Sequence, residues 1–162
     1  MYLQYSFSSD SFNPTIMNDR TISDHYGHDH DRLDELFHRF QTLKTSDRAN
    51  AVQAFKEFHA GLERHIVWEE EILFPAFETK TGMTSGPTQV MRWEHQQIQG
   101  FLKAIADKLA AGTNDTGDDE AGLLAVLGPH NHKEENILYP MIDQVTAGAE
   151  RTQIFAEMEK RP

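Results

Sequence analysis

The sequence predicts an all-α protein, an up-down-up-down antiparallel four-helix bundle, and three observations support this fold class. Four segments carry apolar residues spaced three and four apart, which is the pattern of an amphipathic helix. Turn-rich stretches separate these segments, and no segment has the alternating pattern of a strand. Short connections place neighbouring helices antiparallel, and 162 residues suffice for one domain with a substantial core.

The first two expected helices form one hairpin. The first, residues 21–43, has an apolar face made of Leu33, Leu36, Phe37, Phe40 and Leu43. Residues 45–47 (TSD) interrupt the pattern and offer N-caps for the second helix, residues 47–79. Pro75 has no N–H to donate, so we expect it to bend or loosen the last turns of this helix.

The other two expected helices form a second hairpin after the turn-rich residues 81–88. The third helix spans 88–110, the loop GTNDTGDD follows, and the fourth helix spans 120–147. Bundle residues 21–147 are thus flanked by an aromatic arm, 1–20, and a tail, 148–162, with a short extra helix. We expect arm and tail either to cover a bundle end or to form a homodimer.

Composition excludes several classes of function. The chain has no cysteine, which rules out disulfides, iron–sulfur clusters and thiolate catalysis. Its net charge of −11 disfavours nucleic acid and anionic membranes as partners. Neither a signal peptide nor an apolar membrane span is evident, so we expect a cytoplasmic protein.

An internal repeat selects a subset of the nine histidines. Shifting the chain by 65 residues aligns HIVWEEEILFP, 65–75, with HNHKEENILYP, 130–140, and DHDRL, 29–33, with EHQQI, 94–98. Each half therefore has one histidine on its first helix and a His-x-x-x-Glu pair on its second. The residues repeated in this way are His30, His65, Glu69, His95, His130 and Glu134.

Helical geometry points these six side chains into the core, because each shares a helix face with large apolar residues. Two carboxylates and four imidazoles in an apolar interior have a large desolvation cost unless cations neutralise the charge. Oxygen and nitrogen donors together suit iron or manganese better than zinc. We therefore predict that the six residues bind a pair of metal ions.

The remaining histidines lie off these faces or have no partner at the 65-residue shift; they are His25, His28, His38, His59 and His132. Among them, His28 is the one we expect to join the site if the start of the first helix is irregular. For Glu70 and Glu135 we favour a solvated helix face over hydrogen bonds to the ligand imidazoles.

The six residues resemble the motif of the hemerythrin-like, or HHE cation-binding, family of non-haem di-iron proteins. The resemblance covers about residues 21–147, and the family pattern H…HxxxE…H…HxxxE is matched in order. The Leu-Phe-Pro tail of the family is matched by residues 73–75 and, as Leu-Tyr-Pro, by residues 138–140. A ferritin-like site is disfavoured, because the chain has a single Glu-x-x-His match, Glu35 and His38.

The sequence departs from the oxygen-carrying members of that family. Those members have HxxxH on the third helix and HxxxxD on the fourth, whereas Gln99 and Glu135 stand at these positions here. The resemblance is thus to the four-His, two-Glu bacterial branch. It implies two non-haem iron ions with an oxo or hydroxo bridge, and roughly one open position on each iron. Manganese or zinc would be substitutes.

The resemblance implies a protein that binds O2, NO or peroxide as a sensor, scavenger or oxidoreductase, and it leaves catalytic residues unassigned. One alternative is an iron donor that repairs damaged iron centres. Relatives of that kind carry an extra cysteine-bearing N-terminal domain, whereas this chain has only the 20-residue arm. The other alternative is a metal store or interaction module without turnover.

Overall fold

Nine helical segments and no strand make up residues 20–161, the part of the chain that the computed structural model describes. The aromatic arm, apart from Arg20, lies outside the described residues. The segments are α1 (Ile22–Leu43), α2 (Arg48–Trp68), η2 (Glu69–Leu73), α3 (Phe74–Thr81), α4 (Pro87–Ala110), α5 (Gly117–Lys133), η3 (Glu134–Leu138), α6 (Tyr139–Val145) and α7 (Gly148–Glu159).

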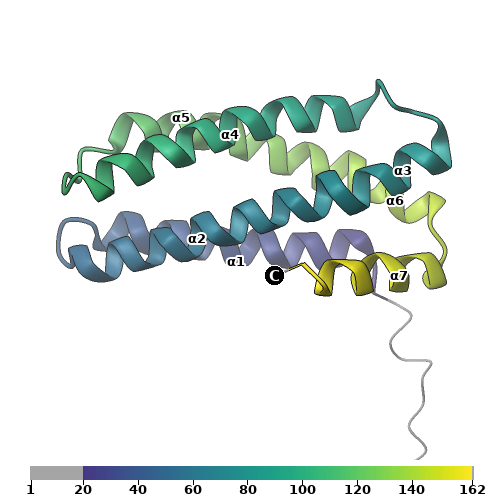
Figure 1. Ribbon diagram of the computed structural model, residues 1–162, viewed down its shortest axis with the longest axis horizontal. Coiled ribbons are helices and arrows are strands. Elements are labelled where there is room, and N and C mark those ends of the chain that lie inside the picture. Colours follow the sequence, from purple (N-terminus) through teal and green to yellow (C-terminus); the bar gives the residue numbers. More distant parts are fainter. Residues whose placement is uncertain (1–19, 162) are drawn as a thin grey trace, which may run out of the picture.

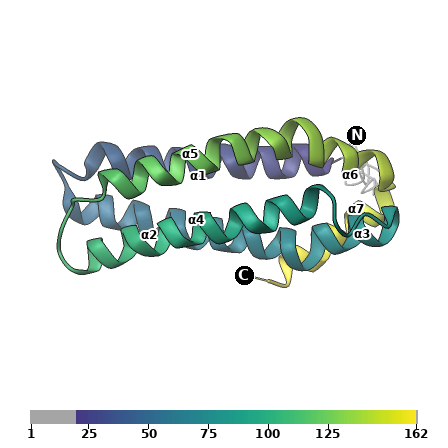
Figure 2. The same ribbon diagram turned by 90° about the horizontal axis from the view of Figure 1, so that it is seen from above.

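All of these segments except α7 form four antiparallel rods (Figure 1). The first rod is α1, the second is α2 continued by η2 and α3, the third is α4, and the fourth is α5 continued by η3 and α6. Viewed from above, α1 lies beside α5 and α2 lies beside α4 (Figure 2). The predicted up-down-up-down bundle is confirmed, and so is the short extra helix of the tail, α7.

The second and fourth rods each contain one π-helical turn in place of the predicted unbroken helix. The N–H of Phe74 bonds to the carbonyl of Glu69, and the N–H of Tyr139 bonds to the carbonyl of Glu134, five residues back. A proline follows each of these donors, and a proline ring clashes with the carbonyl four residues before it in a regular helix. The wider turn accommodates the ring. The expected loosening at Pro75 is thus a π turn.

The apolar core is divided into two clusters. One cluster, near the 44–47 and 111–116 loops, is dominated by residues such as Phe37, Phe40, Phe55, Phe58, Ile98 and Leu102. The other, at the opposite end of the bundle, contains residues such as Ile22, Leu73, Phe77, Met91, Leu138 and Ile142. Burying each such side chain contributes about 1.5–3 kcal/mol. The buried histidines and glutamates belong to neither cluster.

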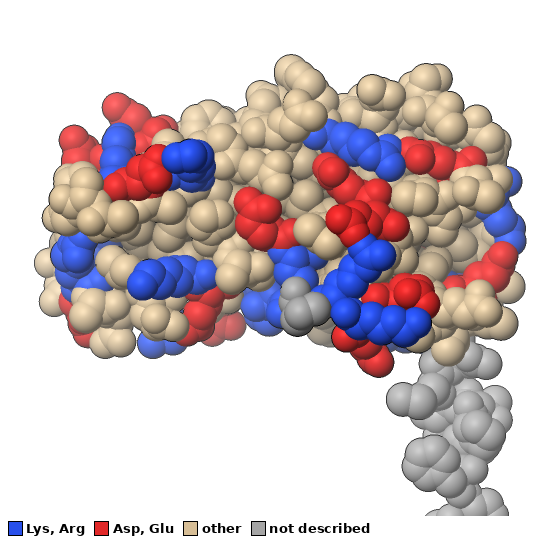
Figure 3. Space-filling view, in the orientation of Figure 1, with Lys and Arg blue, Asp and Glu red and all other residues tan. Residues whose placement is uncertain are grey.

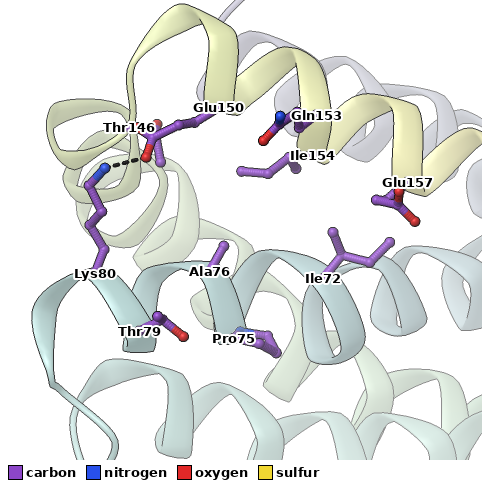
Figure 4. A pocket seen from close by; sticks show the side chains of 10 residues that line it. All are labelled: Ile72, Pro75, Ala76, Thr79, Lys80, Thr146, Glu150, Gln153, Ile154 and Glu157. Atoms are coloured by element: carbon purple, nitrogen blue, oxygen red, sulfur yellow. Dashed lines mark hydrogen bonds and ion pairs between the residues drawn. The ribbon is translucent and has the colours of Figure 1, made fainter.

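Helix α7 covers one end of the bundle, as expected for the tail. Its Ile154 and Met158 pack into the second apolar cluster. Between α7 and the rod containing α3 lies a groove of about 430 Å³, spanned by the Lys80–Glu150 ion pair (Figure 4). This groove contains none of the six predicted metal ligands.

The start of α1 is held by the carboxylate of Asp143 on α6. Its oxygens accept from the N–H of Ile22 at 2.7 Å and from the N–H and hydroxyl of Ser23 at 3.0 and 2.7 Å. A carboxylate at a helix N-terminus satisfies free N–H groups and interacts favourably with the helix dipole.

Replacing Asp143 with alanine should lower the free energy of unfolding by about 1–2 kcal/mol, because α1 loses these acceptors. Urea denaturation followed by circular dichroism measures the change. Asp143→Asn keeps one acceptor oxygen and should lose less. Equal stability of the alanine variant and the wild type would refute the role of Asp143.

Candidate metal centre

All six predicted ligands lie together in a buried layer between the two apolar clusters. His30 comes from α1, His65 from α2, His95 from α4 and His130 from α5. Glu69 and Glu134 begin the two π turns and have no exposed surface. The four histidines are at most 3% exposed.

The four imidazoles direct Nε2 at the two buried carboxylates. The closest pairs are His130 Nε2 to Glu134 Oε1 at 3.0 Å, His95 Nε2 to Glu69 Oε2 at 3.1 Å, and His30 Nε2 to Glu134 Oε2 at 3.4 Å. His65 Nε2 lies 3.2 Å from His30 Nε2 and 3.8 Å from Glu69 Oε2. These atoms form two groups that could each hold a cation: Glu69, His95, His130 and Glu134 in one, and His30, His65 and Glu134 in the other. Glu134 is therefore shared by both groups.

In each of the four ligand histidines, the other ring nitrogen, Nδ1, contacts a further carboxylate. The Nδ1 pairs are His30–Glu135 at 2.7 Å, His65–Asp29 at 2.9 Å, His95–Glu70 at 2.8 Å and His130–Glu94 at 2.9 Å. A carboxylate at Nδ1 fixes the ring tautomer that leaves Nε2 free to bind a metal. The expectation of a solvated role for Glu70 and Glu135 was therefore wrong. Both lie on partly exposed helix faces, yet each reaches a histidine of the opposite half of the repeat.

Asp29 and Glu94 are functional residues that the sequence reasoning missed. Asp29 precedes His30, and Glu94 precedes His95, so the 65-residue shift pairs the two acids. This repetition of an acidic residue beside each histidine could have identified them. Each is held by a cation, Asp29 by Arg32 and Glu94 by Lys133. Burial alone would raise the pKa of Asp29, but His65 and Arg32 outweigh it and lower the pKa to about 2. Asp29 therefore stays ionised beside His65.

The neighbouring carboxylates, buried and partly exposed, raise the affinity of His30 and His95 for protons. Burial by itself lowers the pKa of His30, but Glu134 and Glu135 outweigh it and raise the pKa to about 9. Likewise, Glu69 and Glu70 outweigh the burial of His95 and raise its pKa to about 10. In the absence of metal, protons thus take the place of cations on these imidazoles.

Tyr139 breaks the symmetry of the repeat. Its hydroxyl donates to Glu69 Oε1 at 2.7 Å or to Glu134 Oε2 at 3.0 Å, so it contacts both buried carboxylates. Burial, and then the charges of Glu134 and Glu69, raise the pKa of Tyr139 well above its ordinary value, so the phenol stays protonated. The equivalent residue in the other half is Phe74, which stacks on the ring of His95 with an interplanar angle of 6°.

The donor set fits a pair of cations. Glu69 Oε2, Glu134 Oε1 and His95 Nε2 are buried, and among the described residues none of them is in a well-aligned hydrogen bond, although each lies 3.0–3.1 Å from an imidazole or carboxylate atom of the site. Buried polar atoms are nearly always paired, and charged ones are paired or bind metals. Cations between the imidazoles would satisfy these atoms and neutralise both carboxylates.

Comparison with protein families gives an independent result. Residues 21–142 match the hemerythrin family, described as the hemerythrin HHE cation binding domain. The chain belongs to this family. Comparison with the curated proteins and with the solved structures found no match. Within residues 20–161, no helix is long and apolar enough to cross a membrane.

The remaining histidines of the HHE domain lie outside both cation groups. His28 is exposed, with its Nδ1 2.7 Å from the carbonyl oxygen of Asp24, and so does not join the site. His132 is exposed beside Asn136. Glu35 and His38 are also exposed, which agrees with rejecting a ferritin-like site. Gln99, at the position of the missing fifth histidine, donates to Glu63 at 2.9 Å instead.

Proposed function

We propose that this HHE domain binds two iron ions through His30, His65, Glu69, His95, His130 and Glu134, and that the centre binds O2, NO or peroxide. The sharing of Glu134 by two overlapping groups of buried ligands carries the proposal. A negatively charged carboxylate close to two cations would reduce their mutual repulsion, and Glu134 lies within reach of histidines from both halves. The role would be that of a sensor, a scavenger or an oxidoreductase.

Iron is favoured by the donor set. Imidazole nitrogen and carboxylate oxygen suit iron and manganese, whereas structural zinc sites are rich in thiolates, which this chain lacks. When bound, iron supplies redox chemistry and a place for a small exogenous ligand. One group has three residues and the other four, and Glu69 Oε2 also lies 3.8 Å from His65 Nε2 of the smaller group.

The protein's own residues have separate tasks in this proposal. The four outer carboxylates keep each histidine in one tautomer and make it a better donor to metal. The two apolar clusters limit the access of water to the buried layer. Tyr139 holds a proton beside both carboxylates, where it can stabilise negative charge that develops on a bound ligand.

Anaerobic loading with ferrous iron tests the proposal. Metal analysis should give two irons per chain, and a His65→Ala variant should retain less. Repeated addition of peroxide should then give repeated turnover if the protein is an oxidoreductase or scavenger. A single stoichiometric oxidation would favour storage or sensing, and a chain that takes up no iron would refute the proposal.

Removing the Tyr139 hydroxyl should destabilise the metal-free protein. In Tyr139→Phe, two buried carboxylates lose a shared donor, and we expect the free energy of unfolding to fall by about 1–3 kcal/mol. Chemical denaturation in the presence of a chelator measures this change. Tyr26→Phe is the matched control, since Tyr26 is equally buried, and its hydroxyl donates to the weakly accepting sulfur of Met158 at 3.7 Å and not to a carboxylate of residues 20–161. Equal losses in the two variants would contradict the proposed role of Tyr139.

A further inference from the structure

A cleft of about 330 Å³ between α1 and α5 leads from the surface to one of the proposed ligands. Its polar lining consists of His30, Asp31, Asp34, Asn131, His132 and Glu135. Asp31, Asp34, His132 and Glu135 are exposed, whereas His30 is only 3% exposed and lies at the inner wall. The cleft thus combines an acidic mouth with a buried imidazole.

The 65-residue repeat provides an internal comparison, because it maps the α1–α5 face onto the α4–α2 face. Asp31 and Asp34 correspond to Gln96 and Gln99, and Asn131 and His132 correspond to Ile66 and Val67. Most of the charged or polar groups on one face are therefore neutral or apolar on the other, although the histidines behind both faces are retained.

The two faces also differ in how closely their helices are linked. On the α4–α2 face, the amide of Gln99 donates to the carboxylate of Glu63 at 2.9 Å and so bridges the two helices. The residue equivalent to Glu63 on the α1–α5 face is Gly128, and nothing lies within 4 Å of a Cβ placed there. Within the described residues, the α1–α5 face therefore has free carboxylates and no such bridge, whereas the Glu63 carboxylate of the α4–α2 face is engaged in a bridge between its two helices.

Potential ligands continue from this cleft into the buried layer. Glu135, whose side chain is 44% exposed, lies 2.7 Å from His30 Nδ1. The opposite nitrogen of that ring lies 3.4 Å from Glu134 Oε2, which is fully buried. Carboxylates and an imidazole therefore extend from solvent to the carboxylate shared by both cation groups. The side-chain amide oxygen of Asn131, a residue that also lines the cleft, is buried and has no hydrogen-bond partner in the described part of the chain.

We propose that metal cations reach the buried centre through the cleft between α1 and α5, with Asp31 and Asp34 attracting the ion and His30 as the first buried ligand it meets. This inference rests on the proposed function, because it presupposes that the centre binds metal. A cleft lined by one sign of charge raises the local concentration of the opposite ion and the rate of its binding. The clusters toward the two bundle ends consist of apolar side chains, which do not attract a hydrated cation.

Stopped-flow loading of the metal-free, full-length protein tests this path, with cobalt(II) as a divalent probe that absorbs visible light. The double variant Asp31→Gln, Asp34→Gln carries the side chains of the opposite face. Its loading rate at low ionic strength should fall about tenfold, and the final stoichiometry should not change. High salt should narrow the difference between variant and wild type, because salt screens exposed charges.

Two further variants separate the effect of blocking the cleft from the effect of removing surface charge. Gly128→Leu fills the cleft without changing its charge and should also slow loading, with circular dichroism confirming the fold. Asp115→Gln with Asp118→Gln removes two exposed carboxylates near the 111–116 loop and should leave the rate unchanged.

Unaltered rates in both cleft variants, at normal stoichiometry, would overturn the proposed path while leaving the proposed function intact. A wild-type protein that binds no cobalt or iron at equilibrium would overturn the proposed function itself.

Discussion

Glu134→Gln is expected to weaken metal binding at both positions, by at least about 100-fold, in a protein that still folds. Glu134 contributes to both cation groups, and its two oxygens lie near His130 and His30. Glutamine keeps the shape but removes the charge that balances the cations. This loss of metal affinity should exceed the roughly 10–100-fold loss that follows when a residue hydrogen-bonded to a metal ligand is removed. Competition with a chelator of known affinity measures it.

The neighbouring variant Glu135→Gln provides the matched control. It removes the same charge one residue further along but affects only the hydrogen bond to His30 Nδ1. We expect a smaller loss, confined to one of the two bound ions. If both variants lose the same affinity, or if Glu134→Gln still binds two ions tightly, Glu134 is not the shared ligand.

As pH rises above 6.5, the metal-free protein should become less stable, whereas metal binding should become tighter. In the folded metal-free chain the pKa of His30 is about 9 and that of His95 about 10, against an ordinary value of 6.5. A raised folded-state pKa stabilises the fold fully below pH 6.5, and this stability is lost as pH rises through 9 and 10. The free energy of unfolding should therefore fall by several kcal/mol between pH 6.5 and 10.

Acid has a separate effect on the metal-free protein. Burial alone would raise the pKa of Glu134, but the neighbouring histidines outweigh it and hold the pKa well below 4.5. The stability due to this ionised carboxylate is present above pH 4.5 and is lost as pH falls through its depressed pKa. Maximal stability of the metal-free chain is thus expected between about pH 4.5 and 6.5.

In the metal-loaded protein, stability should not fall above pH 6.5 as it does in the metal-free protein, because a bound metal requires neutral imidazoles. Loading at pH 7 should release protons, and metal affinity should rise with pH. Urea denaturation across pH 5–10, with chelator or with metal, measures the stabilities, and an indicator dye in weak buffer measures the protons. His132→Gln, at an exposed position, should leave both profiles unchanged. A metal-free protein whose stability is flat above pH 6.5 would contradict this account.

Much of the architecture was predictable from local patterns. Apolar spacing located the four rods, since a helix that buries one face must repeat its apolar residues every three or four positions. Pro75 marked where the second rod would depart from regular helix, although neither its π turn nor the equivalent π turn before Pro140 in the fourth rod was foreseen. The 65-residue repeat singled out six of the chain's polar residues, and all six lie in the buried layer.

Contacts between rods could not be predicted from local sequence patterns. Glu70 and Glu135 stand on partly exposed helix faces, and no local pattern shows that each reaches a histidine of the other half. Tyr139 looks like one more apolar residue of its helix until the fold brings its hydroxyl to Glu69 on another rod. The cleft beside His30 likewise depends on how α1 and α5 pack.

The sequence by itself determined the four-helix bundle and the duplicated His and His-x-x-x-Glu pattern, because these depend on the spacing of residues along the chain. The resemblance of that pattern to the HHE motif indicated the cation-binding family. Only the tertiary structure decided which carboxylate orients each imidazole, that Glu134 serves both cation groups and that Tyr139 makes the two halves unequal. Those relations join side chains up to 105 positions apart, such as His30 and Glu135, whose distance is set by packing between rods.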